Sequence, residues 1–397
     1  MGKPKIRFEG YSEDWEQRKV CNITTSYSGG TPKSGSTEYY DGDIPFIRSG
    51  EIYSDKTELF ITELGMKNSS AKMVHEGDIL YALYGATSGE VSRAKLDGAI
   101  NQAILAIIPN DDINANFLVE WFRKEKDKIT DTYLQGGQGN LSAQIIKELE
   151  VTIPSYDEQN KIGLYFEQLN TLITLHQRKC EETKTLKKYM LQKMFPQNGH
   201  SVPEIRFSGF TEDWEQRKFG EIVEKYEDPV ETPTEGYTRL GIRSHAKGTF
   251  HSYVEKGKEL ETAKMFRVAA DKFIVNITFG WEHAVAITDE NDAGKLVSHR
   301  FPQYSFNAGM DPKFFRYLIL DENFKHHLEL SSPGGAGRNR VLKLSDMLEY
   351  KMIFPSEAEQ RKIATYFDDL DHLITLHQRK CNELKEIKKY MLQNMFV

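Results

Sequence analysis

The nine residues LITLHQRKC occupy positions 172–180 of the chain and occur again, unchanged, at 373–381. The sequence KKYMLQ follows each copy, at 187–192 and at 388–393. In both pairs the second copy lies 201 residues after the first (373 minus 172, and 388 minus 187). A repeat of this length indicates that the chain is built from two half-molecules of related structure.

A second repeat lies near the start of each half. IRFEGYSEDWEQRKV at 6–20 returns as IRFSGFTEDWEQRKF at 205–219, with 11 of 15 positions identical and an offset of 199 residues. The sequences between the repeats differ widely. Halves that keep their ends alike while their middles diverge predict a symmetric frame that carries two different recognition surfaces.

The C-terminal part of each half has the pattern of one long helix. Ser155 and Glu158 open the first copy and Ser356 and Glu359 open the second, a spacing that predicts a capping box at each helix start. Apolar residues then recur at steps of three and four, as on a helix that packs against another helix. The predicted contact positions are Ile162, Phe166, Leu169, Ile173 and His176 in the first helix and Ile363, Phe367, Leu370, Ile374 and His377 in the second.

These two helices are predicted to pair with each other. An amphipathic helix of roughly 40 residues, about 55 Å long, cannot bury its apolar stripe alone, and its repeat copy is the obvious partner. Because a globular domain separates the copies, we expect antiparallel pairing about a pseudo-twofold axis. Equivalent residues then meet only at the crossing, which places His176 beside His377, with Cys180 and Cys381 on opposite sides of it.

The two middles are predicted to be β-rich domains with scattered helices. GDILYALYGATSGEV at 77–91 alternates apolar residues and then turns, and IRS at 47–49 recurs at 242–244, which indicates one shared fold. The predicted class is α+β, with two β-rich mixed domains separated by two long antiparallel coiled-coil helices in an internal pseudo-twofold repeat. The predicted boundaries are 1–154 for the first domain, 155–195 for the first helix, 196–204 for a linker, 205–355 for the second domain and 356–397 for the second helix.

The composition of the 397-residue chain is that of an ordinary globular protein, with 39% hydrophobic and 28% charged residues. No apolar run approaches the roughly 18 residues of a membrane span and no signal-peptide core is present, so we expect a cytoplasmic protein without membrane contact. A net charge of −7 argues against nucleic-acid binding through bulk positive charge. Three cysteines without a CxxC spacing predict neither a disulfide framework nor a zinc site.

The sequence offers no catalytic constellation. It lacks the phosphate-loop, dinucleotide-binding, HExxH and GxSxG motifs, and it lacks the Asn/Asp-Pro-Pro-aromatic motif that amino-methyltransferases use at their target base. We therefore predict no catalytic residue, no metal ligand and no cofactor in this chain.

Candidate DNA contacts in the first domain follow from side-chain chemistry and repeat position. Arg48 occupies the same point as Arg243, and a shared arginine is as consistent with a phosphate contact or a structural role as with the reading of a base. An Asn-Gln pair presents the paired donor and acceptor that adenine requires. For the tyrosines beside the turn at Gly85, a position in the core is the commoner alternative. The candidates are Arg48, Ser49, Tyr81, Tyr84, Thr87, Ser88, Asn101, Gln102, Gln138 and Asn140.

In the second domain, the segment GGAGRNR at 334–340 combines glycines, which allow close approach to phosphate, with arginine and asparagine, which suit guanine and adenine. The alternative for such a loop, and for its counterpart GGQGN at 136–140, is a plain turn leading towards the helix. His245 and Lys247 have no counterpart in the first domain and favour a role in specificity. The candidates are Arg243, His245, Lys247, Thr278, Trp281, His299, Arg300, Arg338, Asn339 and Arg340.

Taken together and in this duplicated order, the motifs resemble the specificity subunits of type I restriction–modification systems over essentially the whole chain. No single motif is sufficient for this assignment. The resemblance is carried by PKIRFEGYSEDWEQRKV and PEIRFSGFTEDWEQRKF, by GDILYALYGATSG and INQAI, by FIVNITFGWEHAVAI and VSHRFP, and by the helix starts IPSYDEQNKI and FPSEAEQRKI.

The resemblance implies two target-recognition domains, each reading one half of a bipartite site in double-stranded DNA. It implies that the helices set the spacing between the domains and dock two modification subunits, which carry S-adenosylmethionine and methylate adenine at N6. Restriction subunits, added to this complex, would use ATP and Mg²⁺ to translocate and cleave DNA. The chain itself is implied to be non-catalytic.

Two other classes of function remain open at this point. One is a non-enzymatic protein-interaction scaffold built on the paired helices, which are close to neutral in charge and suit protein binding better than DNA binding. The other is a self-sufficient methyltransferase with tandem recognition domains, against which the missing motifs count. A steep salt dependence of binding would separate DNA recognition from a scaffold.

Overall fold

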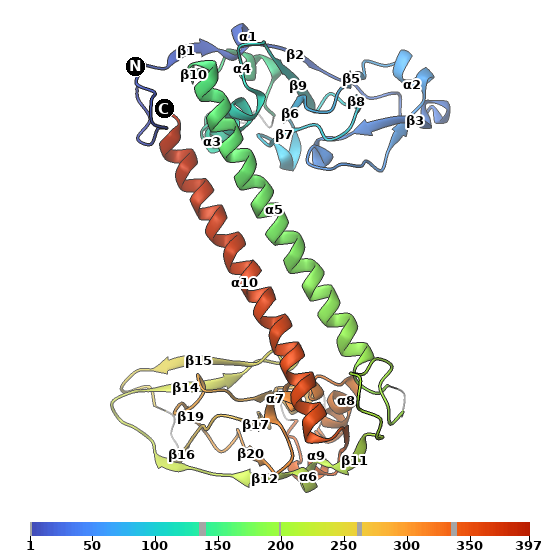
Figure 1. The fold of residues 1–397 in the computed structure, drawn as a ribbon, viewed down its shortest axis with the longest axis vertical. Coiled ribbons are helices and arrows are strands. Elements are labelled where there is room, and N and C mark those ends of the chain that lie inside the picture. The colour runs from blue at the N-terminus through green and yellow to red at the C-terminus, as the bar shows by residue number, and fades with distance from the viewer. Residues whose placement is uncertain (1, 135–139, 198–199, 260–263, 335–339) are drawn as a thin grey trace. The chain divides into compact units, whose positions relative to one another are not determined.

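The computed structural model describes residues 2–134, 140–197, 200–259, 264–334 and 340–397 (Figure 1). It divides into two compact units, of which unit 1 consists of Met1–Arg178 and His377–Val397 and unit 2 of Lys179–Leu376. The two long helices, α5 (Tyr156–Lys193) and α10 (Glu357–Met395), each contribute one part to each unit. The globular part of unit 1 that precedes α5 is called head 1 below, and the globular part of unit 2 that precedes α10 is called head 2.

Head 1 is built on two four-stranded sheets. Its elements are β1 (Glu16–Lys19), α1 (Val20–Ile23), β2 (Thr24–Ser28), η1 (Thr37–Tyr39), β3 (Tyr40–Ile47), η2 (Ser49–Glu51), β4 (Phe60–Ile61), α2 (Glu63–Lys67), β5 (Lys72–Val74), β6 (Ile79–Ala82), η3 (Gly85–Thr87), β7 (Val91–Arg93), β8 (Gly98–Ile100), β9 (Ile104–Pro109), α3 (Ala115–Tyr133), α4 (Ala143–Glu148) and β10 (Glu150–Ile153). The strand orders are β2-β9-β6-β7 and β4-β3-β8-β5. Strand β6 is buried along its whole length, as its continuous apolar sequence requires.

Head 2 has one four-stranded and one five-stranded sheet. Its elements are β11 (Glu215–Lys218), α6 (Phe219–Ile222), β12 (Val223–Tyr226), β13 (Pro229–Glu231), β14 (Tyr237–Ile242), β15 (Thr249–Val254), β16 (Lys264–Arg267), β17 (Lys272–Val275), η4 (Gly280–Glu282), β18 (Val285–Ile287), β19 (Leu296–Val297), β20 (Gln303–Phe306), α7 (Pro312–Leu318), α8 (Glu322–Leu330), α9 (Leu344–Leu348) and β21 (Lys351–Phe354). The strand orders are β12-β20-β17-β18 and β13-β16-β19-β14-β15.

The two heads share one arrangement of strands. The sheet β2-β9-β6-β7 corresponds to β12-β20-β17-β18, and each second sheet contains a parallel pair, β3 with β8 in head 1 and β14 with β19 in head 2. Head 2 differs in its six-residue strand β15, which forms a hairpin with β14 where head 1 has only the two-residue β4. The predicted α+β class and the predicted common fold of the two domains are confirmed.

Both predicted starts of the long helices are confirmed. Helix α5 begins at Tyr156, directly after Ser155, and α10 begins at Glu357, directly after Ser356.

Among the described residues, no helix combines the length and the apolarity that crossing a membrane would require.

The glutamates of the predicted capping boxes have a partner that the capping prediction did not include. Glu158 accepts two hydrogen bonds of 2.8 Å from Nε and Nη2 of Arg7, and Glu359 accepts two of 2.7 Å from the same atoms of Arg206. Both glutamates are only 1% exposed, and a buried carboxylate is stable only with a charged, well-aligned partner. The arginines of the repeated IRF sequence therefore fix each helix start to the N-terminal segment of its own half.

The next residue in each helix, a buried glutamine, fixes the helix start to the head. Gln159 Oε1 accepts a 2.9 Å hydrogen bond from the backbone N–H of Asn114, the N-cap of α3. Gln360 Oε1 accepts a 2.9 Å bond from the N–H of Asp311, the N-cap of α7. The repeated Glu-Gln pair thus holds each long helix on both sides, which explains why it is identical in the two halves.

Within each unit, the parts of α5 and α10 pack antiparallel. In unit 1 the ring of Phe396, just after α10, lies 5.8 Å from Phe166 in the first part of α5; in unit 2 the ring of Phe195, just after α5, lies 6.0 Å from Phe367 in the first part of α10. This confirms the predicted antiparallel pairing. Of the predicted contact positions, Ile162, Phe166, Leu169, Ile173, Ile363, Phe367 and Leu370 are buried, and His176, Ile374 and His377 are half-buried.

The predicted meeting of the two histidines is also confirmed. Nδ1 of His176 lies 3.0 Å from Nδ1 of His377, so one imidazole must donate and the other accept. Cys381 lies in the core of unit 1, whereas Sγ of Cys180 lies 3.8 Å from the carbonyl of Ile374 in unit 2. The equivalent cysteines therefore lie in different units, as the predicted antiparallel pairing requires.

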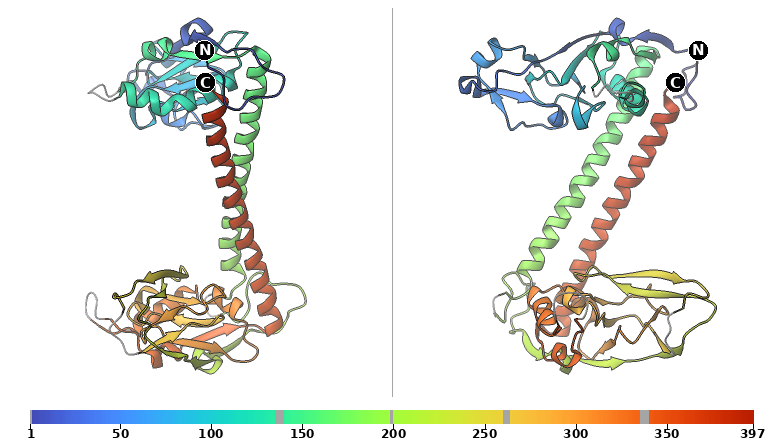
Figure 2. Two further views of the ribbon diagram at one scale, coloured as in Figure 1. Left: turned by 90° about the vertical axis from the view of Figure 1, so that its left-hand side faces the viewer. Right: turned by 180° about the vertical axis from the view of Figure 1, so that it is seen from behind.

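The two ends of the chain lie side by side in unit 1 (Figure 2). The backbone N–H of Ile6 donates to the carbonyl of Asn394 at 2.9 Å. In unit 2 the N–H of Ile205 donates to the carbonyl of Lys193, also at 2.9 Å. These are equivalent positions of the repeat, so each N-terminal segment closes onto the end of a long helix in the same way.

Candidate nucleic-acid interface

In head 1, three chain segments that carry predicted DNA contacts meet. The N–H of Leu83 donates to the carbonyl of Ala103 at 2.8 Å, and the carbonyl of Leu83 accepts from the N–H of Leu141 at 3.0 Å. These bonds place the turn η3, the connection from β8 to β9 and the chain before α4 next to one another. The candidates brought together are Tyr84, Thr87, Ser88, Asn101, Gln102 and Asn140.

Head 2 has the same junction with different side chains. The N–H of Ile277 donates to the carbonyl of Arg300 at 3.0 Å, and the carbonyl of Ile277 accepts from the N–H of Leu342 at 2.8 Å. The candidates brought together here are Thr278, Trp281, His299, Arg300 and Arg340. The same backbone arrangement thus carries amide and hydroxyl side chains in head 1, and arginines with a tryptophan in head 2.

The shared arginines lie beside this junction. In head 1, Ile47 pairs with Ile100 in the parallel strands β3 and β8, so Arg48 and Asn101 leave neighbouring strands side by side. In head 2, Arg243 follows β14 and Arg300 follows soon after β19, its parallel neighbour. The ends of parallel strands therefore collect polar residues at one edge of the second sheet in each head.

Arg48 is engaged in ion pairs within head 1. Its Nη2 lies 2.8 Å from Oε1 of Glu51 and 3.0 Å from Oε2 of Glu58, and the neighbouring Ser49 is half-buried at the start of η2. The hydrogen bond to Arg48 lowers the pKa of Glu51 to about 2, and hydrogen bonds to both glutamates raise the pKa of Arg48. A phosphate would have to compete with two carboxylates, so the structure favours the structural role for this arginine.

Tyr81 is not available to DNA, and its assignment as a contact is wrong. It lies in β6, is fully buried, and packs edge-on against Phe122 of α3 with ring centroids 5.2 Å apart. Burial also raises the pKa of its hydroxyl. The predicted alternation of this strand is wrong, because Ile79–Ala82 form a continuous apolar run that is buried on both faces.

The remaining candidates of head 1 divide into turn-forming and exposed side chains. The hydroxyl of Ser88 donates to the carbonyl of Gly85 at 2.9 Å and Oδ1 of Asn101 accepts from the N–H of Ala103 at 3.0 Å, so both stabilise their own turns. Gln102 is exposed and accepts a 2.6 Å hydrogen bond from the hydroxyl of Thr31. Asn140 is exposed, Tyr84 and Thr87 are half-buried, and Gln138 lies outside the described residues.

In head 2, a turn between β14 and β15 presents two of the predicted specificity residues. His245 and Ala246 have φ angles of 61° and 48°, in the left-handed region that side chains other than glycine rarely adopt. Their N–H groups donate to the carbonyls of Glu282 and His283, each at 2.8 Å, which fixes the turn on η4. His245 and Lys247 are both exposed on this docked turn.

Arginine–aromatic pairs are the second feature of head 2. The guanidinium of Arg340 lies 5.5 Å from the ring centroid of Trp281, and that of Arg243 lies 5.4 Å from Phe250. Among the described residues, the buried Nε of Arg340 has no hydrogen-bond partner. Stacked arginines of this kind have a fixed plane, which suits the bidentate recognition of guanine or phosphate.

The other candidates of head 2 are consistent with a surface position. His299 and Arg300 are exposed, and Thr278 is half-buried, with its N–H donating to Oδ1 of Asn276 at 3.1 Å. Arg338 and Asn339 lie outside the described residues.

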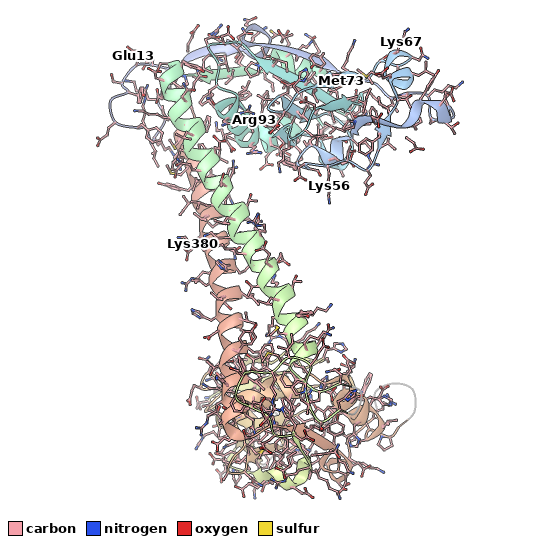
Figure 3. All side chains as sticks on the ribbon, turned by 45° about the vertical axis from the view of Figure 1, so that its right-hand side comes forward. Glu13, Lys56, Lys67, Met73, Arg93 and Lys380 are labelled. Carbon is pink, nitrogen blue, oxygen red and sulfur yellow. The ribbon has the colours of Figure 1, made fainter. Side chains whose placement is uncertain are left out.

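Several exposed aromatic and basic side chains near these junctions were not predicted. Tyr53 and Lys56 are exposed in the loop between η2 and β4, and Figure 3 shows Lys56 projecting from head 1. Phe250 and Tyr253 are exposed on β15, where Tyr253 is 66% accessible. Large aromatic residues are most often buried, so the sequence alone does not show that these are exposed.

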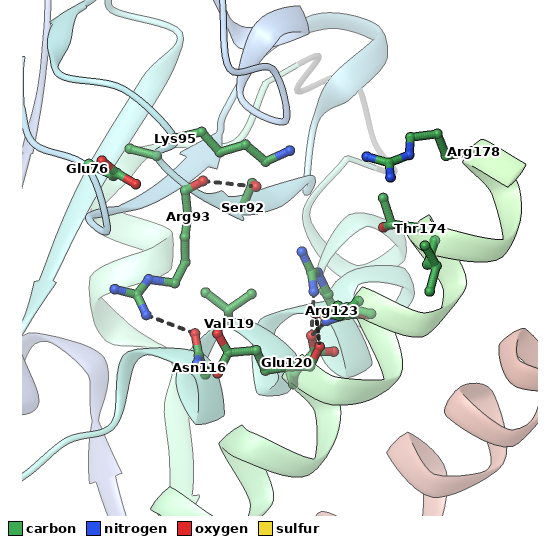
Figure 4. Close-up of a pocket in the computed structure, with 15 residues that line it drawn as sticks. Glu76, Ser92, Arg93, Lys95, Asn116, Val119, Glu120, Arg123, Thr174 and Arg178 are labelled. Carbon is green, nitrogen blue, oxygen red and sulfur yellow. Dashed lines mark hydrogen bonds and ion pairs between the residues drawn. The ribbon is translucent and has the colours of Figure 1, made fainter. Parts of the chain in front are cut away.

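A polar cavity of about 490 Å³ lies in unit 1 between β7, α3 and α5 (Figure 4). Two of its four cations have partners in the lining: Arg93 donates to Oδ1 of Asn116 at 2.9 Å, and Arg123 is paired with Glu120. Lys95, Arg178, Glu76 and Glu167 complete its charged lining. With positive and negative groups interleaved, this cavity has no pronounced preference for a phosphate.

Comparisons with known proteins agree with this architecture. A family model described as the type I restriction modification DNA specificity domain matches residues 12–185 and 211–386. The type I restriction enzyme MjaIX specificity subunit of Methanocaldococcus jannaschii is 31% identical, with 96% of this chain and 93% of that protein covered. The type I restriction enzyme HindI specificity subunit of Haemophilus influenzae is 27% identical over 39% of this chain and 36% of its own length. The crystal structure of the type I restriction–modification S subunit from M. genitalium has the same fold, with a TM-score of 0.63 at 14% identity and coverage of 100% and 99%.

Proposed function

This chain belongs to the family of type I restriction–modification specificity subunits, and we propose that each of its heads reads one half of a two-part site in double-stranded DNA. The observation that supports this proposal is the pair of equivalent junctions, in which one backbone frame presents different polar side chains in the two heads. Amides and hydroxyls in head 1 and stacked arginines in head 2 suit different bases. Two unlike half-sites are therefore expected.

We propose that this chain supplies recognition and that partner subunits supply the chemistry. Modification subunits would bring S-adenosylmethionine and transfer its methyl group to adenine N6, after the adenine has been extruded from the helix. Restriction subunits would add ATP- and Mg²⁺-dependent translocation and cleavage. Family membership and the missing catalytic motifs support this division of labour, which places the chain with its partners in the cytoplasm.

We further propose that two copies of the modification subunit bind, one to each half of the repeated frame. Leu172 and Leu373 are identical in the repeat and 43% and 41% exposed, and Tyr189 and Tyr390 are likewise identical and exposed. Exposed apolar residues that are the same in both halves are not needed for either fold, but they suit one partner that binds twice. Lys380, which projects from α10 in Figure 3, also has an identical counterpart, Lys179.

Single charges at these leucines are expected to remove the partners one at a time. Leu172→Asp or Leu373→Asp should each weaken one docking site by about tenfold to a hundredfold, because an exposed leucine that becomes buried contributes about 1.5–3 kcal/mol. Native mass spectrometry of the complex should show two modification subunits with the natural chain, one with either variant and none with both. Gln168→Asp, at an exposed α5 position that the repeat does not keep, is the control. If the double variant still binds two modification subunits, the proposal that Leu172 and Leu373 form the docking sites is wrong.

The function itself is tested by a methylome. The chain is expressed with its modification subunit in a host without adenine methylation, and single-molecule sequencing identifies the methylated bases. The expected result is a split motif with methyladenine in both halves that is absent when this chain is omitted. A stable complex that produces no motif would contradict DNA recognition and would support the scaffold alternative.

Salt dependence separates the same two alternatives in vitro. Phosphate contacts release counterions, so DNA binding by the complex should weaken steeply between about 50 and 200 mM salt. Binding that is insensitive to salt and confined to protein ligands would instead support a scaffold built on the paired helices.

A further inference from the structure

Two lysines at equivalent repeat positions, Lys388 and Lys187, are each half-buried, and their hydrogen-bond partners differ between the two units. In unit 1, Nζ of Lys388 lies 2.7 Å from Oδ1 of Asn170 on α5 and 3.0 Å from Oε2 of Glu120 on α3. The side chain of Lys388 is 16% exposed and that of Glu120 is 3% exposed. A cation at this depth requires a carboxylate, and in unit 1 the head supplies it.

In unit 2 the carboxylate comes from the long helix instead. Nζ of Lys187 lies 2.6 and 2.7 Å from the two carboxylate oxygens of Asp371 on α10. Head 2 contributes Tyr317 of α7, whose hydroxyl donates to Asp371 at 3.1 Å and whose ring centroid lies 5.1 Å from Nζ of Lys187.

The two sets are equivalent position by position. Asn170 and Asp371 are 201 residues apart, like the two lysines (371 minus 170, and 388 minus 187). Glu120 lies on α3, which follows β9, and Tyr317 lies on α7, which follows the equivalent strand β20. Glu120 accepts a hydrogen bond from Asn170, and Tyr317 donates one to Asp371. In unit 1 the head supplies the acidic partner, Glu120, and the long helix supplies the neutral one, Asn170. In unit 2 the long helix supplies the acidic partner, Asp371, and the head supplies the neutral one, Tyr317.

We propose that these contacts match each head to the long helix that follows it, so that a head can be exchanged only together with residue 170 or 371. This inference goes beyond DNA recognition and concerns which heads the frame accepts. Head 2 placed before α5 would leave Lys388 with Asn170 and a tyrosine in place of the carboxylate of Glu120. Head 1 placed before α10 would give Lys187 two carboxylates.

The neighbouring charges do not replace the missing partner. Arg123 pairs with Glu120 (Figure 4), and Arg316 lies 3.7 Å from Asp368, which also accepts a 2.7 Å hydrogen bond from Tyr317. Burial lowers the pKa of Lys388, with Glu120 acting in the opposite direction. Removal of the carboxylate therefore leaves the ammonium with an amide as its described partner.

Two chimeric full-length chains test the matching. In the first, residues 205–355 replace residues 6–154, so head 2 is followed by the natural α5. In the second, residues 205–371 replace residues 6–170, which carries Asp371 along with the head. The second chain is expected to melt about 5 °C or more above the first. Asn170→Asp in the first chimera should recover most of that difference with a single change.

Point variants of the natural chain provide an independent test. Glu120→Gln should lower the melting temperature by about 5 °C, because Lys388 loses its carboxylate. Adding Asn170→Asp should restore stability by rebuilding the arrangement of unit 2, and adding Lys388→Met instead should restore it by removing the buried charge. Asn382→Asp, on the exposed face of α10, should have no effect.

Equal melting temperatures of the first chimera with and without Asn170→Asp would overturn the proposal. So would a Glu120→Gln/Asn170→Asp chain that is no more stable than Glu120→Gln alone. Both readouts measure folding only, so they are independent of whether the chain recognises DNA.

Discussion

Phe396→Ala is expected to lower the free energy of unfolding of unit 1 by about 3–5 kcal/mol. Phe396 is buried, and its ring lies 5.2 Å from Phe117, 5.8 Å from Phe166 and 6.3 Å from Trp15. The last residues of the chain thus complete a core that is built mainly from its first 178 residues. Truncation to alanine would leave a cavity surrounded by rings that cannot move together to fill it.

Hydrogen exchange read by mass spectrometry measures this effect unit by unit. Peptides of residues 1–178 should lose protection in Phe396→Ala while peptides of head 2 keep theirs. The matched variant is Phe195→Ala, at the equivalent repeat position, where the ring contacts Trp214, Phe314 and Phe367 of unit 2; the affected peptides should then be those of unit 2. Tyr390→Ala, at an exposed position of α10, should change stability by no more than about 0.5 kcal/mol. Unchanged protection of unit 1 in Phe396→Ala would disprove this account of its core.

Arg206→Ala is expected to destabilise unit 2 by about 3–5 kcal/mol, because it leaves the carboxylate of Glu359 buried without a charged partner. The two hydrogen bonds of 2.7 Å between these side chains are bidentate, and Nη2 of Arg206 also donates to the carbonyl of Glu212 at 2.6 Å. The hydrogen bonds that Arg206 donates to Glu359 are the main cause that raises the pKa of Arg206. Urea unfolding followed by tryptophan fluorescence, with Trp214 and Trp281 as the reporters in unit 2, measures the loss.

The double variant Arg206→Ala/Glu359→Gln separates the cost of a buried charge from the loss of a contact. It should recover more than half of the lost stability, since the orphaned carboxylate is gone. If the double variant is as unstable as Arg206→Ala, the destabilisation arises from packing rather than from charge. Arg7→Ala is the corresponding change in unit 1, where Glu158 takes the place of Glu359.

The repeats explain why the frame could be predicted so fully. A helical stripe that occurs twice must find a partner of equal length, and two identical histidines can meet only where antiparallel copies cross. The sequence did not reveal the partners of Glu158 and Glu359, because a capping box is a local pattern whereas each arginine lies about 150 residues earlier (158 minus 7, and 359 minus 206). Both arginines were visible as identical residues of the IRF repeat, but nothing in the spacing links them to the glutamates.

The sequence identified the turns that carry the candidate contacts, but not how those turns come together. Repeat alignment shows which turns are equivalent, and the structure brings them to one junction in each head. Whether a side chain at such a turn is exposed depends on tertiary packing, which buries Tyr81 under α3 and engages Arg48 with Glu51. The exposed Phe250 and Tyr253 lie on the six-residue strand β15, where head 1 has only the two-residue β4, so the repeat offered no guide to them.

The bond between Ile6 and Asn394 has a consequence for the gene as well as for the fold. In unit 2 the two sides of the equivalent bond, between Ile205 and Lys193, are joined by residues 194–204, whereas residues 1–397 hold no such connection between Ile6 and Asn394. In topological terms the backbone has two equivalent joints, and a connecting segment at the second would make it a ring. A circularly permuted chain that starts near residue 205, with a short peptide joining residue 397 to residue 2, would retain every contact described here. The order in which the two heads are encoded is therefore set by where the ring is opened, and either order specifies the same protein.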